Sequence, residues 1–268
     1  MSLLENIRSR TWTGHNIPLG ESGATIGLHI PLISQDARTL TIKSLIRRFL
    51  DPSRKLRILD LGSLEGGLTL EMAREGWDAT GVEGRLDNFQ KAELIREYYA
   101  LDNLRFQHRD VKTLSRERDG VFDAILCCGL LYHLDNPFLL LETLAHMTAP
   151  DGLLFLDTHV APDENAARFA THAHQLSERE TFVHEGERYE GRWFTEPAPK
   201  SGTVLDEQWS ATSNDRSFWP TRRALIRGTY RAGFHSIAEL FGMFEINVEF
   251  DLRDKFSRLY LACMREWT

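Results

Sequence analysis

The strongest constraint on the fold is an alternation of apolar, strand-like segments with helical segments between residues 57 and 160. Helical patterns over 65–75, 87–100 and 136–147 lie among strand-like runs whose sequences are RILDLG, DATGVEG, LRFQHRD, FDAILCCG and GLLFLDTHV. Helical crossovers join parallel strands, and a parallel sheet is covered by helices on both faces. The alternation therefore predicts a doubly wound α/β sheet of the Rossmann-like kind.

Signals at the helix ends support these boundaries. Gly76 is expected to end the first helix, because glycine tolerates the left-handed backbone that often follows a helix. Asp87 with Gln90 resembles a capping box at the start of the second helix. Asn136 followed by Pro137 is typical of a helix start, since proline suits the first helical turn.

The flanking segments predict two additions to this sheet within a single domain. Residues 1–54 hold a turn-rich stretch and an amphipathic helix, which we expect to form an N-terminal cap. Residues 161–217 are polar, and a connection of this length is usually a lid or an inserted subdomain. Residues 218–268 predict one more helix and two strands that pair as a hairpin at the sheet edge. The Rossmann-like core would then comprise 55–160 and 218–268.

Composition excludes several classes of protein. The chain is 42% hydrophobic and 26% charged, as in ordinary globular proteins, and no apolar run approaches the roughly 20 residues that span a bilayer. We expect a cytoplasmic protein, since the first residues also lack the apolar core of a secretory signal. The formal net charge of -7 disfavours nucleic acid as a partner. Cys127, Cys128 and Cys263 lack CxxC spacing and are expected to be buried thiols.

A glycine-rich turn follows the first strand in the stretch LRILDLGSLEGGLTLEMA. In an open α/β sheet, ligands bind at the carboxyl ends of the strands, where glycines let backbone amides approach the ligand. The turn is not a dinucleotide GxGxxG fingerprint, because Leu64 stands at the second glycine position, and it lacks the GK[ST] of a P-loop. A tight turn without any ligand is the alternative.

Acidic residues at the ends of three successive strands strengthen the ligand interpretation. Asp60 precedes the glycine turn, Glu83 ends the second strand, and Asp110 follows the third. Glu83 lies about 20 positions beyond Asp60, where a carboxylate can accept both hydroxyls of a ribose. Asp110 stands where it could accept a hydrogen bond from an exocyclic amine. The three acids and the glycine turn therefore favour a bound ligand over an empty turn.

The motifs ILDLGSLEGG, GVEGR, RDV and FDAILCCGLLYHL resemble successive motifs of class I S-adenosylmethionine-dependent methyltransferases. The resemblance covers residues 56–160 with the terminal helix and hairpin, and it implies a seven-stranded sheet with an antiparallel last strand. GLLYHLDNP more narrowly resembles the branch that includes the tRNA wobble-uridine carboxymethyltransferases and related small-molecule methyltransferases. The cofactor that this resemblance implies is S-adenosylmethionine.

The resemblance also implies a role for each matching position. The residues that would hold the cofactor are Asp60, Gly62, Ser63, Gly66, Glu83, Asp110, Val111, Cys128 and Gly129. Among these, Glu83 would hold the ribose and Asp110 would bond adenine N6. The loop around Gly62 and the end of the fourth strand would face the methionine moiety. Leu64 departs from the family pattern, which commonly has glycine at this position.

Candidates for catalysis and substrate contact lie outside these motifs. Methyl transfer is an in-line displacement, so a base is needed only when the acceptor loses a proton. His133 follows the fourth strand, where a base would face the methyl group, although it could equally be structural. Tyr132 could pack on the cofactor or in the core. Trp12 and His15 could form a flap, and Trp219 lies in an aromatic stretch typical of small-molecule pockets.

Histidines gather in and beside the expected lid, at His159, His172, His174 and His184. Imidazole suits divalent metal ions, but none of the spacings matches a tight ligand motif such as HExxH. We therefore predict no metal site.

These patterns favour methyl transfer from S-adenosylmethionine to a small-molecule acceptor, with oxygen as the preferred acceptor atom because His133 offers a base. A tRNA-modifying (carboxy)methyltransferase is an alternative, but it needs a basic face. A nicotinamide-dependent oxidoreductase would share the architecture, although its glycine fingerprint is missing. A cofactor-binding protein without turnover is a third alternative. The sequence does not identify the acceptor, and a homodimer is compatible with it.

Overall fold

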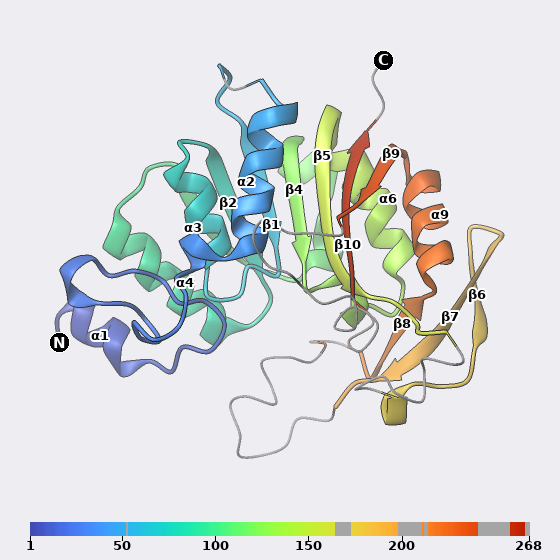
Figure 1. Ribbon diagram of the computed structural model, residues 1–268, viewed down its shortest axis with the longest axis horizontal. Coiled ribbons are helices and arrows are strands. Elements are labelled where there is room, and N and C mark those ends of the chain that lie inside the picture. The colour runs from blue at the N-terminus through green and yellow to red at the C-terminus, as the bar shows by residue number, and fades with distance from the viewer. Residues whose placement is uncertain (52, 164–172, 198–210, 212–213, 241–257, 266–268) are drawn as a thin grey trace.

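A seven-stranded sheet forms the centre of the protein (Figure 1). The computed structural model describes residues 1–51, 53–163, 173–197, 211, 214–240 and 258–265. The strands, in spatial order, are β3 (Leu104–His108), β2 (Asp78–Glu83), β1 (Arg57–Leu61), β4 (Phe122–Cys128), β5 (Thr148–His159), β10 (Arg258–Arg265) and β9 (Phe234–Glu239). The pairs among β1 to β5 are parallel, whereas β10 runs antiparallel to both of its neighbours. The predicted Rossmann-like sheet with an antiparallel last strand is confirmed.

Helices cover both faces of this sheet, because successive strand side chains point to opposite sides. In β1, Ile58 packs into a core with side chains of α1, α2, α3 and α4, while its neighbour Leu59 packs into a second core with side chains of α6 and α9. The helices are α1 (Leu3–Ser9), α2 (Ala37–Phe49), α3 (Gly67–Arg74), α4 (Leu86–Tyr99), α5 (Arg116–Asp119), α6 (Pro137–Met147) and α9 (Arg222–Ala232). The sheet is therefore covered by an apolar core on each face.

The predicted start of α6 is confirmed. The side chain of Asn136 accepts a hydrogen bond from the Leu139 amide, and Pro137 occupies the first turn. The predicted capping box at Asp87 is wrong, because α4 begins at Leu86 and has no side-chain cap.

The start of α3 also differs from the prediction, since this helix begins at Gly67 rather than at Glu65. Gly66 precedes it with φ +82°, a left-handed conformation in which the backbone has not yet entered the helix. At its other end, α3 stops at Arg74, and Gly76 takes the left-handed conformation expected after a helix.

The inserted segment contains a second, three-stranded antiparallel sheet in the order β6-β7-β8. Its strands are β6 (Glu180–His184), β7 (Glu187–Thr195) and β8 (Arg216–Pro220). The expected boundary of the insertion at residue 218 falls within β8, which pairs with β7 and not with the large sheet. We call β6, β7 and β8 the small sheet.

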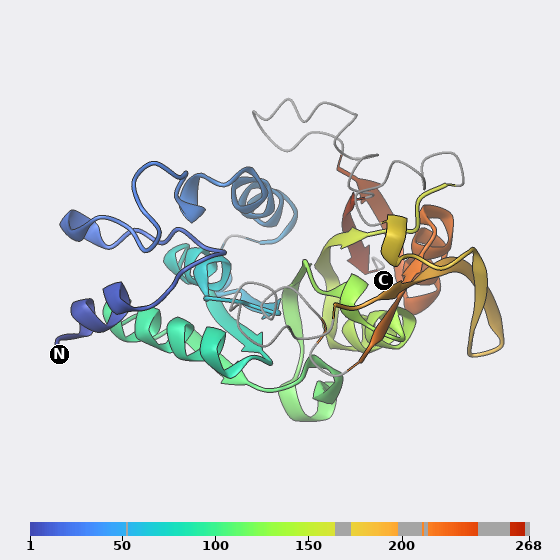
Figure 2. The same cartoon turned by 90° about the horizontal axis from the view of Figure 1, so that it is seen from below.

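The part of the N-terminal segment that precedes α2 and the small sheet lie on opposite sides of the molecule, beyond the edge at which the parallel strands end (Figures 1 and 2). Short 3-10 helices occur in both regions and in the loops between them: η1 (Gly20–Ser22), η2 (Ile33–Gln35), η3 (Val111–Thr113), η4 (Leu131–His133) and η5 (Ala173–Gln175). None of the helices in the described ranges has the length and apolar character that crossing a bilayer requires. The edge between the two regions is where a ligand binds in an open α/β sheet.

Candidate active site

A cavity of about 320 Å³ opens at this edge. It is lined by Gly14, His15, Arg38, Gly62, Leu64, Glu83, Gly84, Arg85, Asn88, Asp110, Val111, Lys112, Cys128, Gly129, Leu130, Tyr132, His133, Leu134, Ala211, Asn214 and Arg258. The lining combines loops that follow four parallel strands with residues of the N-terminal segment, the insertion and β10. Its volume lies within the range of about 300 to 1,000 Å³ that small-molecule sites occupy.

The glycine turn shapes one wall of this cavity through its backbone conformation. Gly62 and Gly66 have φ values of +63° and +82°. A Cβ atom on Gly66 would lie 2.5 Å from Cζ of Phe106, so glycine is also required there by space. Leu64 adopts φ +53°, a left-handed conformation that explains why glycine is common at this position in the family that the sequence resembles. The loop keeps its path at a cost of about 1 kcal/mol in local strain.

Glu83 lies at the end of β2 and lines the cavity. Its Oε2 accepts the Leu64 amide at 2.8 Å, and its Oε1 accepts the Arg85 amide at 2.7 Å. Burial raises the pKa of Glu83, and these two amides act in the opposite direction. Each carboxylate oxygen has a second lone pair that can accept a ligand hydroxyl.

Asp60 supports the glycine turn from behind and does not line the cavity. It is buried and accepts a hydrogen bond from the Thr69 hydroxyl at 2.6 Å. Burial raises its pKa to about 7. Ser63 and Gly66 are also absent from the lining, and the buried Ser63 hydroxyl has no hydrogen-bond partner among the described residues.

The other residues predicted to hold the cofactor do line the cavity: Asp110, Val111, Cys128 and Gly129. Asp110 caps η3 by accepting the Lys112 amide at 2.9 Å. The expectation of buried thiols holds for Cys127 and Cys263, whereas Cys128 is half-buried.

Two arginines at the cavity were not predicted. Arg38 at the start of α2 and Arg258 at the start of β10 both bond to Asp157, whose side chain is 3% exposed. Arg38 donates to Oδ2 at 2.8 Å, and Arg258 donates to both carboxylate oxygens at 2.8 Å. These residues lie more than 100 positions from Asp157 in the chain, so no sequence pattern joins them.

His133 lies in η4, after β4, and faces the cavity together with Tyr132. Its Nδ1 atom is 3.0 Å from Oε1 of Glu196, a buried residue that follows β7. The small sheet fixes this loop in place, because the Phe218 amide donates to the Leu134 carbonyl at 2.9 Å. Burial raises the pKa of Tyr132 to about 12, so its hydroxyl keeps its proton near neutral pH.

Both tryptophans that were candidates for substrate contact lie outside the cavity lining. Trp219 is buried between the rings of His159 and Phe194, at centroid distances of 4.8 and 4.7 Å, and its indole NH donates to the Tyr132 carbonyl. Trp12 is buried in the core that includes α1, and its indole NH donates to the Ile7 carbonyl. Trp219 thus holds the loop of Tyr132 in place, and Trp12 holds the segment that leads to His15.

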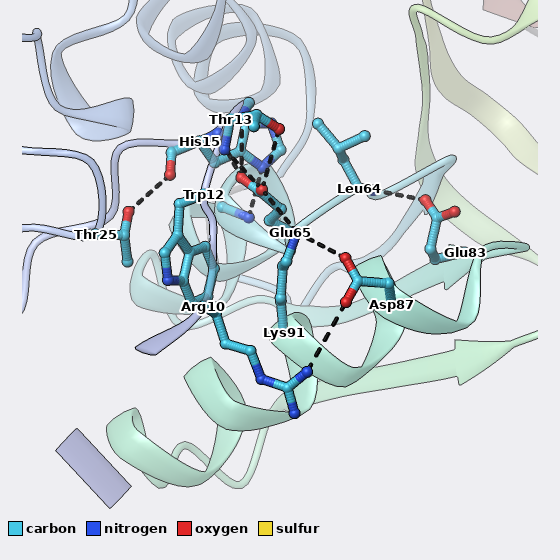
Figure 3. A network of polar contacts seen from close by, with 12 residues as sticks. Arg10, Trp12, Thr13, His15, Thr25, Leu64, Glu65, Glu83, Asp87 and Lys91 are labelled. Atoms are coloured by element: carbon cyan, nitrogen blue, oxygen red, sulfur yellow. Dashed lines mark hydrogen bonds and ion pairs between the residues drawn. The ribbon is translucent and has the colours of Figure 1, made fainter. Parts of the chain in front are cut away.

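The segment of residues 12–16, which we call the N-terminal arm, is attached to the glycine turn through Glu65 (Figure 3). This glutamate is fully buried and accepts the backbone amides of Thr13, Gly14 and His15 at 2.9, 3.0 and 2.9 Å. Lys91 of α4 is 3.6 Å from the same carboxylate and 2.8 Å from Asp87. The Glu65 side chain is thus committed to holding the arm against the glycine turn.

His15 adds a second attachment, because its Nδ1 accepts the Gly67 amide at 2.9 Å. Only the neutral tautomer that carries its proton on Nε2 can accept this hydrogen bond. Burial, together with the charge of Arg38, lowers the pKa of His15 to about 3. The arm thus closes one side of the cavity with a histidine that stays neutral.

The histidines considered for a metal lie apart. His159 stacks on Trp219, whereas His184 is 2.9 Å from Glu142 and His174 lies in η5. His172 lies outside the described residues. Within the described ranges, no group of three His, Cys, Asp or Glu side chains could hold a metal ion.

Sequence comparison matches residues 34–235 to the family described as a methyltransferase domain. A ubiquinone biosynthesis O-methyltransferase of Psychrobacter cryohalolentis is 35% identical over 103 residues, which cover 38% of this chain and 40% of that protein. The chain thus spans about two fifths of the length of the curated relatives it matches.

Two solved structures extend the similarity beyond the shared core. The N-terminal domain of EvdMO1 with SAH bound has 27% sequence identity and a TM-score of 0.65, covering 87% of this chain and 82% of that chain. The same domain in the presence of SAH and D-fucose has 25% identity and a TM-score of 0.71, covering 99% of this chain and 98% of that chain. The small sheet and the arm fall within the second alignment.

Proposed function

This chain belongs to the methyltransferase-domain family, and from that premise we propose that it transfers a methyl group from S-adenosylmethionine to an oxygen atom of a small molecule. One observation carries the proposal. A single cavity brings Glu83 and Asp110, which suit a nucleoside, together with the imidazole of His133. A methyl donor and a base are the two requirements for methylating a hydroxyl group.

The residues fit S-adenosylmethionine in chemistry as well as in position. Glu83 presents free lone pairs for the ribose hydroxyls, and Asp110 presents an acceptor for the adenine amine. Gly62 and Gly129 have no side chain and lie on the wall where the methionine moiety would approach. The bound sulfonium supplies an electrophilic methyl group, and the chain supplies alignment, exclusion of water and a proton acceptor.

Oxygen is the preferred acceptor atom for two reasons. A hydroxyl loses a proton when it is methylated, and His133 lies where that proton can be accepted. The relatives named as ubiquinone biosynthesis O-methyltransferases act on oxygen by their names, and the solved domain was crystallised in the presence of a sugar. Hydroxylated aromatic compounds and deoxysugars are therefore the acceptor classes to examine first.

A tRNA substrate is less compatible with the formal charge of -7, since a phosphate backbone needs a basic surface. A protein without turnover would bind the donor and methylate none of the acceptors. Bulk tRNA, added to the acceptors of the screen below, separates the first alternative from the second.

The experiment is isothermal titration with S-adenosylmethionine and S-adenosylhomocysteine, followed by a methylation screen of phenols, catechols and deoxysugars. We expect micromolar binding by the wild type and at least a roughly 10-fold weaker Kd for Glu83→Ala, because hydrogen bonds to a charged group contribute about 1.5–3 kcal/mol each. The matched control is Glu97→Ala, at an exposed position of α4. Absence of binding by the wild type would overturn the proposal.

A further inference from the structure

We propose that Glu196 is a positioning residue for the reaction, which holds His133 in the orientation and tautomer that accept the proton of the acceptor hydroxyl. The inference rests on the proposed function and extends it to a residue of the inserted segment. Several hydrogen bonds converge on the buried Glu196 carboxylate.

The side chain of Glu196 is 3% exposed and has three polar neighbours. The Ala211 amide donates to Oε2 at 3.0 Å, the Ser217 hydroxyl donates to Oε1, and Nδ1 of His133 lies 3.0 Å from Oε1. An ionised carboxylate has no proton to donate, and this arrangement offers it three donors. The neutral imidazole therefore carries its proton on Nδ1.

The tautomer leaves the lone pair on the other ring nitrogen. No described residue forms a hydrogen bond to Nε2 of His133, and the side chain, which is 13% exposed, lines the cavity. An unprotonated Nε2 facing a cavity is the arrangement that a general base needs. Glu196 fixes this nitrogen's state without touching the substrate itself.

This geometry serves the in-line displacement that moves the methyl group. The acceptor oxygen forms a bond to the methyl carbon while the bond from that carbon to sulfur breaks, and the electron pair of the broken bond stays on sulfur. The hydroxyl proton passes to Nε2 of His133. The resulting imidazolium lies beside the Glu196 carboxylate, which stabilises its charge, and the proton later leaves to water.

The loop and the insertion are joined by more than this one contact. The Asn214 side chain donates to the His133 carbonyl at 3.1 Å and to the Ser217 hydroxyl at 3.0 Å. Trp219 donates to the Tyr132 carbonyl at 2.8 Å. His133 and Glu196 are 63 positions apart in the chain, so the base is oriented only when the insertion is docked on the core.

The test compares Glu196→Gln with Glu190→Gln. Glutamine keeps the volume and one acceptor oxygen but removes the charge, and Glu190 lies on β7 with a side chain that is 67% exposed. Methyl transfer is measured with an acceptor found in the screen. In protein labelled with 15N-histidine, the imidazole of His133 is titrated by NMR, and its signal is assigned by its loss in His133→Gln.

We expect kcat of Glu196→Gln to fall by about 10- to 100-fold, because a general base contributes about 10²- to 10⁴-fold and only part of that depends on its orientation. The ring titration and the acidic limb of the kcat/KM profile should both move downward by about one pH unit, since an anion beside the imidazolium has been removed. Affinity for S-adenosylhomocysteine and the behaviour of Glu190→Gln should match the wild type. The remaining charged groups of the cavity, Arg38, Glu83, Arg85, Asp110, Lys112 and Arg258, are unchanged in both variants.

An unchanged kcat and ring titration in Glu196→Gln would overturn the inference. So would a loss of activity accompanied by equal losses of cofactor affinity and stability, because that pattern indicates a structural role alone. A wild type that binds no S-adenosylmethionine would overturn the proposed function instead, and the titration experiment with Glu83→Ala detects this first.

Discussion

The N-terminal arm and the insertion border the same cavity, and each is attached to the core through one buried glutamate. Glu65 belongs to the core and binds the arm, whereas Glu196 belongs to the insertion and binds the core at His133. Both carboxylates accept at least three hydrogen bonds or ionic contacts. Each attachment thus depends on one buried acceptor, and the two differ in their donors.

The donors decide what each attachment can do. Glu65 accepts backbone amides, which neither gain nor lose protons, and the ammonium of Lys91, which lies inside the protein at 2% exposure. Glu196 faces the imidazole of His133, a residue that lines the cavity. A buried carboxylate therefore fixes shape when its partners are amides, and it can control a proton when its partner is a histidine.

The largest effect is expected on the arm. Glu65→Ala leaves three backbone amides without their acceptor and takes from Lys91 one of its two carboxylate neighbours, and removal of one partner from a buried ion pair costs about 3–5 kcal/mol. We expect the free energy of unfolding to fall by about 3 kcal/mol, the lower end, because Lys91 keeps Asp87. Urea unfolding measures this change, and Glu97→Ala is the control. Equal stability of the two variants would show that the arm is not held by Glu65.

A smaller effect on the free energy of unfolding, limited to acidic pH, is expected at His15. Its pKa is lowered from 6.5 to about 3 in the folded protein, so the unfolded chain binds a proton between these values and the folded one does not. The stability that His15 contributes is present above pH 6.5 and is lost as the pH falls towards 3.

The variant His15→Asn keeps an acceptor for the Gly67 amide without a titrating ring. When the pH is lowered from 7.5 to 4.5, we expect the free energy of unfolding of the wild type to fall by about 2–3 kcal/mol more than that of the variant. Urea titrations at both pH values measure this, with the exposed His29→Asn as control. A difference between variant and wild type that does not change with pH would contradict a buried neutral His15.

The smallest effect on stability is expected at the insertion. Asn214→Ala removes donors to the carbonyls of His133 and Arg216, at 3.1 and 2.9 Å, and should lower the free energy of unfolding by about 1 kcal/mol. Methyl transfer should fall while affinity for S-adenosylhomocysteine is kept, because the contact orients the base and not the cofactor. A loss of cofactor affinity in the variant, measured by isothermal titration, would contradict this prediction and indicate that Asn214 has a purely structural role.

The sheet and most of its helices could be predicted from the sequence because they depend on signals close together in the chain. Alternating strand residues such as Ile58 and Leu59 encode the two faces, and Asn136 with Pro137 encodes a helix start. Asp87 carries a similar signal, but the helix start predicted from it is wrong. Glu83 binds the Arg85 amide, and α4 begins before Asp87. A local signal holds only where no tertiary contact competes for the same backbone.

The order of the elements, the glycine turn and the place of Glu83 and Asp110 at the cavity follow from patterns in the chain, because the ends of parallel strands meet at one edge. Tertiary packing fixed the positions of Trp12 and Trp219, which are buried behind that cavity. It also decided which groups surround the two glutamates. The partners of Glu65 in the arm lie 50 to 52 positions away, and His133 lies 63 positions from Glu196. Contacts over such distances form only when the arm and the insertion pack on the core, and no spacing in the chain encodes them.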